Sequence, residues 1–377
     1  MSDVYVGIDL EQFIGDPHAT GIQRVLQYLG REWPKDIPAA FVIPVEGQLA
    51  IVTPQAAAQL VDRAFDERSS DDDLAVRIDA FVQEIEHEPL SRPVTDVFSH
   101  WLLPEVSYLP TVLDRARAMQ QKGSLTMIGY DALPMTDPAN YRFIPGHAAE
   151  ISEYFRLLAQ AQHVVAISDY SRTSIGTALR RSLPTDVAHP GGDHVPIVDG
   201  RPPATCRFLR VGTLEARKKP VEIIEAFEAA TDQGMSAQLT FIGRPSASDE
   251  AINRRIRSAI ANGYPVEWIA GAPDSAVHEA MNTSTYFLSV GIEGYGIPVL
   301  ESIRLGTPVL FGGTQPAAEL MRGHGAAPIE WETKDQLASS LATAAGEAPP
   351  QPDPTAVPTW RDFVARVTEV AIRPPLA

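Results

Sequence analysis

The sequence has only one cysteine, Cys206, in 377 residues. A single thiol excludes an internal disulfide and a cysteine-based metal cluster. No run of about 18 apolar residues occurs, which predicts that no segment spans a membrane. The opening residues, MSDVYVGIDLEQF, lack a basic stretch followed by an apolar core, so we expect no secretion signal. These absences together predict a cytoplasmic protein.

Positive charge is also scarce. Lysine and arginine number 31 against 48 aspartates and glutamates, which gives a formal net charge of -17. This balance argues against nucleic acid or anionic lipid as a general partner. Arg254, Arg255 and Arg257 form one small basic group, so the sequence leaves peripheral membrane contact open.

The glycine fingerprint of dinucleotide-binding enzymes is missing. It would read G-x-G-x-x-G after a strand, with an acidic residue about 20 positions further on. Neither residues 4–11 nor residues 211–219 contain it. We therefore do not expect a dinucleotide-dependent oxidoreductase.

Short apolar runs alternate with amphipathic segments throughout the chain, which is the pattern of a parallel sheet covered on both faces. In the first half, strands are predicted at 4–8, 40–43, 94–99, 125–129 and 164–167, and helices at 20–33, 54–65, 108–120, 147–161 and 170–181. In the second half, strands are predicted at 207–211, 239–242, 266–269, 286–290 and 309–311, and helices at 220–231, 251–261, 275–282 and 298–305. Two complete sets predict two doubly wound α/β domains, as the length also favours.

Proline and glycine mark the domain boundaries. Residues 189–203 are rich in proline and glycine, and residues 346–358 are rich in proline. Both segments lack apolar periodicity, as expected of linkers. We therefore predict an N-terminal domain over 1–198 and a C-terminal domain over 204–355. Residues 360–372 return to helical periodicity, which alone does not decide which domain this helix completes.

The run Glu293-Gly-Tyr-Gly-Ile-Pro-Val-Leu-Glu301 is the most informative feature. Gly294 and Gly296 allow backbone angles that a side chain disfavours, and Pro298 suits the first turn of a helix. The N-terminus of that helix would attract a phosphate, which the two carboxylates would repel. The carboxylates make sense as hydroxyl acceptors on either side of the phosphate, and a sugar nucleotide has hydroxyls on both sides. The plainer interpretation is a loop, a helix start and two solvated glutamates.

A second run, Val211-Gly-Thr-Leu-Glu-Ala-Arg-Lys-Lys219, follows a predicted strand. Cations at the carboxyl end of a strand lie where open α/β sheets bind ligands, and a diphosphate needs such neutralisation. Taken alone, the triplet Arg-Lys-Lys is also typical of a solvated surface.

Together these runs are similar to the retaining glycosyltransferases of the GT-B fold, family 4, also described as glycosyl transferases group 1. Residues 293–301 resemble the family's glutamate-x7-glutamate motif, and residues 211–219 resemble its VGTLEPRKN segment. The resemblance is specific over 207–319 and loose over the first 190 residues. It implies an α/β protein with two Rossmann-like domains facing each other across a cleft. It also implies that the C-terminal helix, residues 359–377, crosses back to the first domain.

The resemblance implies roles in donor binding for the second domain. Arg217 and Lys218 would contact the donor diphosphate, and Glu301 would accept the ribose hydroxyls. Glu293 would hold hydroxyls of the donor sugar or stabilise positive charge on its ring. Backbone groups around Gly294, Tyr295 and Gly296 would take phosphate or sugar oxygens. Lys219 is left out, because the family often has a small or polar residue there.

In the first domain, Gly21 corresponds to the family's glycine-rich opening loop, although helix capping by Thr20 explains the same residues. Asp131 is a candidate to orient or deprotonate the acceptor hydroxyl. It follows Tyr130, where many relatives have histidine. His18, His100 and His147 are candidates to replace that histidine, and each is equally compatible with a structural role.

The resemblance implies a glycosyltransferase that transfers a sugar, such as a hexose, from a nucleoside diphosphate sugar to an acceptor hydroxyl with retention. The acceptor would be a saccharide, a lipid-linked molecule or a small molecule in bacterial polysaccharide, glycolipid or natural-product assembly. No cofactor and no metal are expected, since Arg217 and Lys218 would neutralise the diphosphate. Two alternatives stay open: a catalytically degenerate sugar-nucleotide-binding protein and a GT-B epimerase.

Overall fold

The protein is described from a computed structural model, which covers residues 5–17, 20–65, 71–136, 146–182, 185–246 and 249–374. The chain divides into two compact units. Unit 1 comprises Met1–Pro190 and Trp360–Ala377, and unit 2 comprises Gly191–Thr359.

Unit 1 contains an eight-stranded sheet in the order β4-β3-β2-β1-β5-β6-β7-β8. Its strands are β1 (Val6–Asp9), β2 (Ala39–Val45), β3 (Gln48–Val52), β4 (Glu88–Pro89), β5 (His100–Leu103), β6 (Ser124–Gly129), β7 (His163–Ala166) and β8 (Thr185–Val187). Neighbouring strands pair parallel except β3, which is antiparallel to both β2 and β4. The buried side chains of this sheet, among them Trp101, Leu125 and Val164, form the core of the unit.

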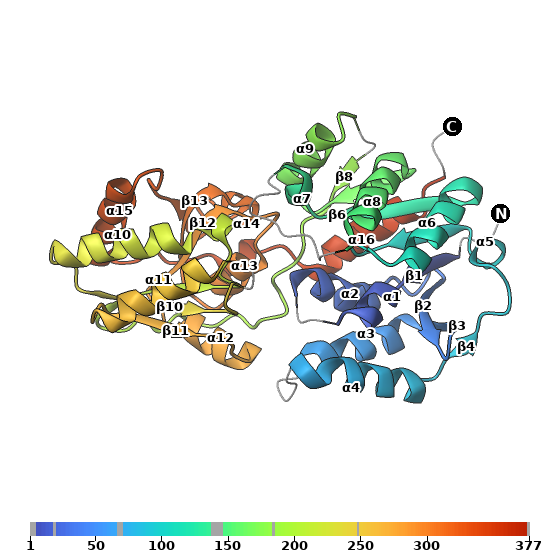
Figure 1. Cartoon of the computed structure of the whole chain (residues 1–377), viewed down its shortest axis with the longest axis horizontal. Coiled ribbons are helices and arrows are strands. Elements are labelled where there is room, and N and C mark those ends of the chain that lie inside the picture. Colours follow the sequence, from blue (N-terminus) through green and yellow to red (C-terminus); the bar gives the residue numbers. More distant parts are fainter. Residues whose placement is uncertain are drawn as a thin grey trace. The chain divides into compact units, whose positions relative to one another are not determined.

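The helices of unit 1 cover this sheet (Figure 1). They are α1 (Glu11–Gly15), α2 (Gly21–Glu32), α3 (Pro54–Asp62), α4 (Asp71–Glu84), α5 (Val94–Val97), α6 (Pro110–Lys122), α7 (Leu133–Thr136), α8 (Ala148–Gln160), α9 (Asp169–Ala178) and α16 (Trp360–Ala371). Several of these helices begin after a residue whose side chain accepts a hydrogen bond from a backbone N–H of the first turn. Thr20 accepts a hydrogen bond from Gln23 N at the start of α2, and Ser168 accepts one from Ser171 N at the start of α9.

The strand predicted over 94–99 is wrong. Val94–Val97 form the short helix α5, and strand β5 begins only at His100. Pro93 precedes the helix with φ of −54°, and Asp96 lies in its first turn. Both favour the start of a helix, which outweighs the strand preference of the valines.

Helix α16 belongs to unit 1, as the GT-B resemblance implies (Figure 1, red helix). Trp360 is buried and stacks on Tyr28 of α2, with ring centroids 4.6 Å apart and planes 8° apart. His163 Nε2 lies 3.1 Å from the carbonyl of Pro374, just beyond this helix. The periodicity of 360–372 left two packings open, and these contacts decide between them.

Unit 2 contains a six-stranded, fully parallel sheet in the order β11-β10-β9-β12-β13-β14. Its strands are β9 (Cys206–Val211), β10 (Ala237–Ile242), β11 (Val266–Ile269), β12 (Tyr286–Ile292), β13 (Val309–Thr314) and β14 (Ala326–Pro328). Its helices are the 3-10 turn η2 (Ala216–Lys218), α10 (Pro220–Asp232), α11 (Glu250–Ala261), α12 (Asp274–Asn282), α13 (Ile297–Arg304), α14 (Pro316–Leu320) and α15 (Lys334–Gly346). The predicted elements of this half are all present, and β14, α14 and α15 are additional.

Part of the predicted linker at 189–203 is built into unit 2. Val198 N donates to the carbonyl of Arg304 at 3.1 Å, and Arg201 N donates to that of Asn282 at 2.8 Å. Asn282 Nδ2 donates in turn to the carbonyl of Asp199 at 2.8 Å. The change of unit therefore lies at Pro190, before the boundary placed at 198 from the sequence.

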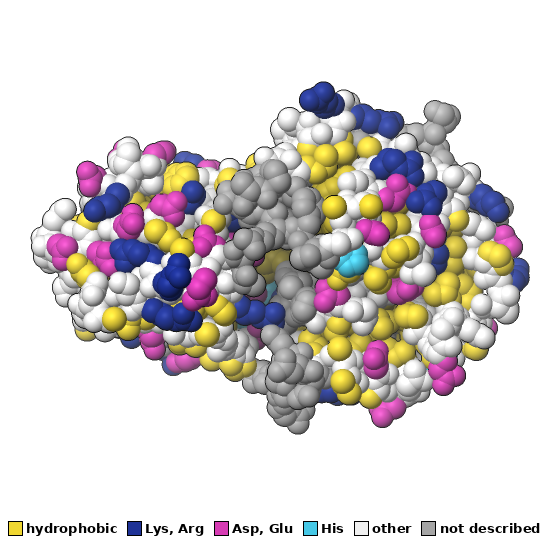
Figure 2. All heavy atoms as spheres, in the orientation of Figure 1, with side chains coloured by type: hydrophobic (Ala, Val, Ile, Leu, Met, Phe, Trp, Pro, Cys, Tyr) yellow, Lys and Arg dark blue, Asp and Glu magenta, His cyan; other side chains and the backbone are white. Residues whose placement is uncertain are grey.

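Acidic and basic side chains are interspersed on the face drawn in Figure 2. Over the described ranges, no helix combines the length and the apolar character that crossing a membrane requires.

Candidate functional site

The turn between β9 and α10 carries the predicted cations. Strand β9 lies between β10 and β12, and after it the chain forms η2, with Arg217 and Lys218. This turn packs closely on Gly291 of β12, which has φ of +106°. A Cβ added at Gly291 would lie 2.0 Å from the carbonyl oxygen of Arg217. Only glycine therefore lets η2 approach the end of β12.

Glu293 lies at the centre of a charge cluster in which Arg210 is buried, while the other two cations and Glu293 itself are about 15% exposed. Its carboxylate oxygens lie 2.7 Å from Arg217 Nη1, 3.1 Å from Lys218 Nζ and 3.5 Å from Arg210 Nη2. Arg217 Nη2 also binds Glu215 at 2.6 Å. Three cations thus face two carboxylates, which leaves one positive charge in excess. The structure brings together two motifs that lie about 75 residues apart in the sequence.

The pKa values in this cluster reflect competition between burial and charge. Burial raises the pKa of Glu293, but Lys218, Arg217 and Arg210 together outweigh it and hold that pKa well below its usual range. Burial lowers the pKa of Lys218 and of Arg210, although Glu293 opposes the change in both. Glu293 is therefore ionised, and it is the group that makes buried cations tolerable here.

Helix α13 begins as predicted beside this cluster. Gly296 caps it with φ of +107°, and Pro298 lies in its first turn. Gly294 is not among the glycines with positive φ, so the predicted need for special backbone angles holds for Gly296 only. The side chain of Tyr295 is buried, which raises its pKa, and its carbonyl accepts a hydrogen bond from Ala317 N at 3.0 Å.

Glu301 lies one turn inside α13 and is buried. His194 Nε2 contacts its Oε1 at 2.6 Å, and both side chains are less than 10% exposed. His194 comes from the proline- and glycine-rich segment 189–203, where no spacing or periodicity relates it to Glu301. Sequence reasoning missed this contact, because it depends on how that segment packs on unit 2.

The candidates in unit 1 are placed by local caps. Gly21 is the first residue of α2, after the capping residue Thr20. Asp131 follows β6, and its Oδ1 accepts a hydrogen bond from Leu133 N at 2.9 Å at the start of α7. The role of Gly21 toward the donor and that of Asp131 toward the acceptor remain predictions.

Tyr130, the residue in the position of the usual histidine, has a structural role. Its hydroxyl donates to the carbonyl of Pro104 at 2.6 Å, and its own carbonyl accepts a hydrogen bond from Ser171 Oγ. Burial raises the pKa of Tyr130 well above its usual value. Tyr130 therefore does not act as a base near neutral pH.

The alternative histidines have partners of their own or fall outside the described residues. His100 is buried, its Nδ1 lies 2.9 Å from Ser99 Oγ, and burial lowers its pKa. The ring of His147 packs on Tyr108, with centroids 4.8 Å apart. His18 lies outside the described residues.

Unit 1 contains a buried carboxyl group that sequence reasoning missed. Glu105 follows β5, is 4% exposed, and has an Oε2 without a hydrogen-bond partner among the described residues. Its pKa is raised to about 8, mainly by burial; the carboxylates of Asp9 and Asp16 contribute to the rise, and hydrogen bonds with Gln23 and with the backbone of Phe13 oppose it. Glu105 is thus mostly protonated at neutral pH.

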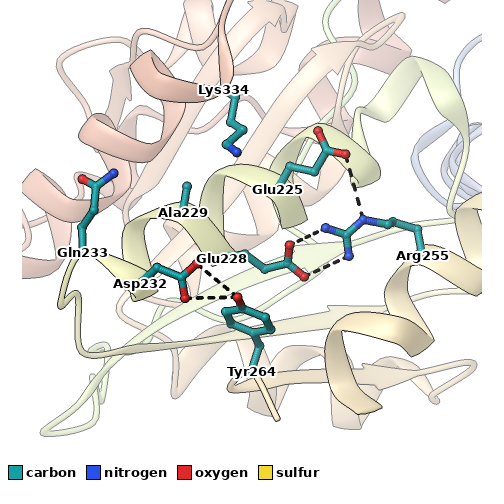
Figure 3. A pocket seen from close by; sticks show the side chains of 8 residues that line it. All are labelled: Glu225, Glu228, Ala229, Asp232, Gln233, Arg255, Tyr264 and Lys334. Carbon is teal, nitrogen blue, oxygen red and sulfur yellow. Dashed lines mark hydrogen bonds and ion pairs between the residues drawn. The ribbon is translucent and has the colours of Figure 1, made fainter. Parts of the chain in front are cut away.

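A separate hollow of about 510 Å³ lies on α10, α11 and α15 (Figure 3). Glu225, Glu228 and Asp232 line it, and they pair with Arg255 or with the hydroxyl of Tyr264. Excess negative charge makes this hollow unsuitable for a diphosphate. Within the described residues, no group of three His, Cys, Asp or Glu side chains could hold a metal ion.

Comparison with known proteins agrees with the family resemblance found in the sequence of the second half of the chain. The family model "Glycosyl transferases group 1" matches residues 200–343. The serotype-specific mannosyltransferase WbdA of Escherichia coli is 25% identical over 142 residues, which are 37% of this chain and 17% of that protein. The chain therefore spans only about a sixth of the length of this relative.

Solved structures resemble the whole chain. Anabaena HepE in complex with UDP and glucose has a TM-score of 0.60 at 14% identity, with 98% of this chain and 95% of that chain covered. The lipopolysaccharide outer core galactosyltransferase WaaB has a TM-score of 0.56 at 16% identity, with 97% and 95% covered. At such identities the likeness concerns the fold.

The two sheets, one mostly and one fully parallel, and these structural neighbours define a GT-B fold. The segment 200–343, which contains the charge cluster and α13, matches the glycosyl transferases of group 1. The resemblance stated from the sequence is thereby confirmed for the GT-B fold and, over residues 200–343, for a match to the model of the glycosyl transferases of group 1.

Proposed function

We propose that this protein is a retaining GT-B glycosyltransferase of family 4 that transfers a sugar from a nucleoside diphosphate sugar to an acceptor hydroxyl. The observation that carries the proposal is the charge cluster in which Glu293 contacts Arg210, Arg217 and Lys218. It lies at the carboxyl ends of β9 and β12, where open α/β sheets bind their ligands. The adjacent N-terminus of α13 adds backbone N–H groups and a positive dipole.

The cluster has the charge that a sugar nucleotide requires. A diphosphate carries about two negative charges and would take Arg217 and Lys218 as counterions. Glu301, inside α13, would accept the ribose hydroxyls, and Glu293 would accept hydroxyls of the sugar. An ionised carboxylate suits this task because it only accepts hydrogen bonds.

The same cations would stabilise the leaving diphosphate, so no metal is needed. Retention would follow if the acceptor attacks on the face that the diphosphate leaves, with the leaving phosphate helping to take the acceptor proton. No enzyme nucleophile is then required. Asp131 would orient the acceptor from unit 1.

The relatives favour bacterial polysaccharide or glycolipid assembly as the setting. WbdA is named as a mannosyltransferase, WaaB as a galactosyltransferase, and HepE is described with UDP and glucose. We infer donors of this kind for this chain. The acceptor would be a saccharide, a lipid-linked molecule or a small molecule, reached at the cytoplasmic side.

Thermal-shift measurements with GDP, UDP, dTDP and ADP, and with their common sugar donors, test the proposed site. A ligand at 100 times its Kd adds about 2.7 kcal/mol to the free energy of unfolding. We expect one nucleotide to stabilise the protein selectively, and Glu301→Gln to weaken this effect. Glu319→Gln, which alters an exposed pair with Arg322, is the matched control and should leave it unchanged.

Activity separates the proposal from its alternatives. Donor hydrolysis without acceptor, lost in Glu293→Gln, supports a transferase. Binding of a donor without hydrolysis or transfer would indicate a degenerate binding protein. This alternative is retained because Tyr130, in the position of the usual histidine, has a structural role. Conversion of the donor sugar to its epimer without acceptor would indicate an epimerase.

A further inference from the structure

Arg210 is the cation of the Glu293 cluster that neither motif predicted. It lies on β9, and β10 and β12 pair with this strand on its two sides. Its side chain is 5% exposed, and its Nη1 donates to the carbonyl of Val211 at 3.2 Å. Its Nη2 lies 3.5 Å from Glu293 Oε1 and has no hydrogen-bond partner among the described residues.

The three cations of the cluster have different backbone support. Arg217 and Lys218 come from the 3-10 turn η2, which ends at Lys219 in a left-handed conformation with φ of 56°. Arg210 comes from the interior of a sheet. The side chains of Arg217 and Lys218 thus extend from a turn beyond the sheet, whereas that of Arg210 extends from a strand that is paired on both sides.

We propose that Arg210 is a positioning residue that keeps Glu293 charged and in place when Arg217 and Lys218 turn from Glu293 to the donor diphosphate. The inference rests on the proposed function. It assigns to Arg210 a role that begins only when the donor is bound.

The charges of the cluster give the physical reason. In the free protein Glu293 faces Arg210 from β9 and Arg217 and Lys218 from the turn, while Glu215 faces Arg217. A bound diphosphate adds about two negative charges beside Glu293 and competes for both cations of the turn. Arg210 then remains as the principal counterion of a buried carboxylate. Without it, Glu293 would take up a proton, because a buried carboxylate beside an anion is costly.

Loss of Arg210 should therefore affect the donor-bound protein more than the free protein. Arg217 and Lys218 still compensate Glu293 when no donor is present. A protonated Glu293 would accept sugar hydroxyls poorly, since one of its oxygens becomes a donor. We expect Arg210→Met to fold, to bind donor more weakly and to lose at least tenfold in kcat.

Proton uptake on donor binding is the decisive measurement. Isothermal titration calorimetry at pH 6, in two buffers with different ionisation enthalpies, counts the protons bound with UDP-glucose or GDP-mannose, whichever the thermal-shift panel selects. Both phosphates of such a donor are diesters and do not titrate near this pH. We expect no proton uptake for the unmodified protein and nearly one proton per donor for Arg210→Met.

Three further variants identify the group and its charge. Arg210→Lys keeps the charge and should restore uptake to near zero. Arg210→Met combined with Glu293→Gln should also show none, because the titrating carboxyl is gone. Arg255→Met removes an arginine paired with Glu228 on the outer hollow (Figure 3) and should behave like the unmodified protein. Arg210→Gln serves as a second neutral variant if Arg210→Met does not fold.

The outcomes separate the two proposals. If the unmodified protein binds no donor, the proposed function fails and this inference fails with it. If it binds donor but Arg210→Met and Arg210→Gln take up no proton and keep their kcat, only the role of Arg210 is overturned. Uptake that persists in the double variant would also overturn it.

Discussion

Glu105 in unit 1 is buried and Glu293 in unit 2 is 15% exposed, and their pKa values move in opposite directions. Burial raises the pKa of each. Around Glu105 the nearby charges are the carboxylates of Asp9 and Asp16, and its pKa reaches about 8. Around Glu293 the nearby charges are three cations, and its pKa falls well below the usual range.

The difference shows what each unit can offer a ligand. A protonated carboxyl such as Glu105 can donate a hydrogen bond, and it gains a charge only as the pH rises. An ionised carboxylate such as Glu293 can only accept, and its cations are available to an incoming anion. Burial alone therefore does not define a site; the sign of the neighbouring charges does.

The largest expected effect follows from removing the negative charge at the centre of the unit 2 cluster. Glu293→Gln leaves Arg210 and Lys218 buried without their carboxylate. We expect a loss of about 3–5 kcal/mol in the free energy of unfolding, as for other broken buried pairs. Urea denaturation should show this loss, and the nucleoside diphosphate should restore part of it by replacing the missing charge.

The matched control is Glu228→Gln, which breaks a pair with Arg255 on the outer hollow. Glu228 and Glu293 are equally exposed, at 15%, but Arg255 is 26% exposed and so keeps more contact with water than Arg210 or Arg217. The cost of Glu228→Gln should be at most about 1 kcal/mol. If Glu293→Gln were as stable as the unmodified protein, water would be compensating the cations. The neighbouring cations would then not explain why Glu293 differs from Glu105.

The second effect is a pH dependence that belongs to unit 1. The folded-state pKa of Glu105, about 8, lies above its ordinary value of 4.5. Between these two values the unfolded chain is ionised while the folded protein keeps its proton. Stability is therefore lost as the pH rises through this window, by about 1.4 kcal/mol for each pH unit.

Denaturation curves of Glu105→Gln at several pH values between 5 and 8 test this effect, and the slope should largely disappear. Glu84→Gln, on the exposed side of α4, should retain the slope of the unmodified protein. An unchanged slope in Glu105→Gln would show that Glu105 is ionised at neutral pH, like Glu293.

A smaller effect concerns the turn that carries the cations. In Gly291→Ala the new Cβ would meet the carbonyl of Arg217 at 2.0 Å, at a φ that alanine disfavours. We expect a loss of about 2–3 kcal/mol, together with loss of nucleotide binding in the thermal-shift assay. Gly263→Ala has a similar positive φ but nothing within 4 Å of its Cβ, so it should cost about 1 kcal/mol and leave binding intact. Normal nucleotide binding by Gly291→Ala would show that η2 need not approach β12.

The smallest expected effect concerns sugar discrimination by Glu301. If His194 orients the Glu301 carboxylate toward ribose, His194→Ala should reduce the preference for UDP or GDP over the 2′-deoxy nucleotide about tenfold, or about 1.4 kcal/mol. Competition binding measures this ratio. His324→Ala, which alters an exposed pair with Asp353, is the control. An unchanged ratio would limit His194 to a structural role.

The sequence predicted most of unit 2, because its strands and helices are regular and its motifs are local. The capped start of α13 at Gly296 and the cations of η2 are examples. The family resemblance implied that Arg217 and Glu293 both bind the donor, and the structure brings the two side chains into contact. Their roles toward a donor stay predictions.

The residues that sequence reasoning missed act through tertiary contacts. Arg210 reads as one of two arginines in an otherwise apolar strand, Gly291 as an ordinary glycine, and His194 as part of a linker. Glu105 follows a strand without any pattern that indicates burial. Each gained its meaning only when a distant segment packed against it, which periodicity and spacing do not encode.

The contact of Trp360 with Tyr28 has a consequence for synthesis of the protein. Unit 1 lacks α16 until the ribosome has made the whole of unit 2, which is about 170 residues of intervening chain. At about 5–20 residues per second this takes roughly 10–30 s. During that time the apolar surface of α2 around Tyr28 lacks its helix, while unit 2 is continuous and can fold on emergence. Unit 1 begins first and is completed last.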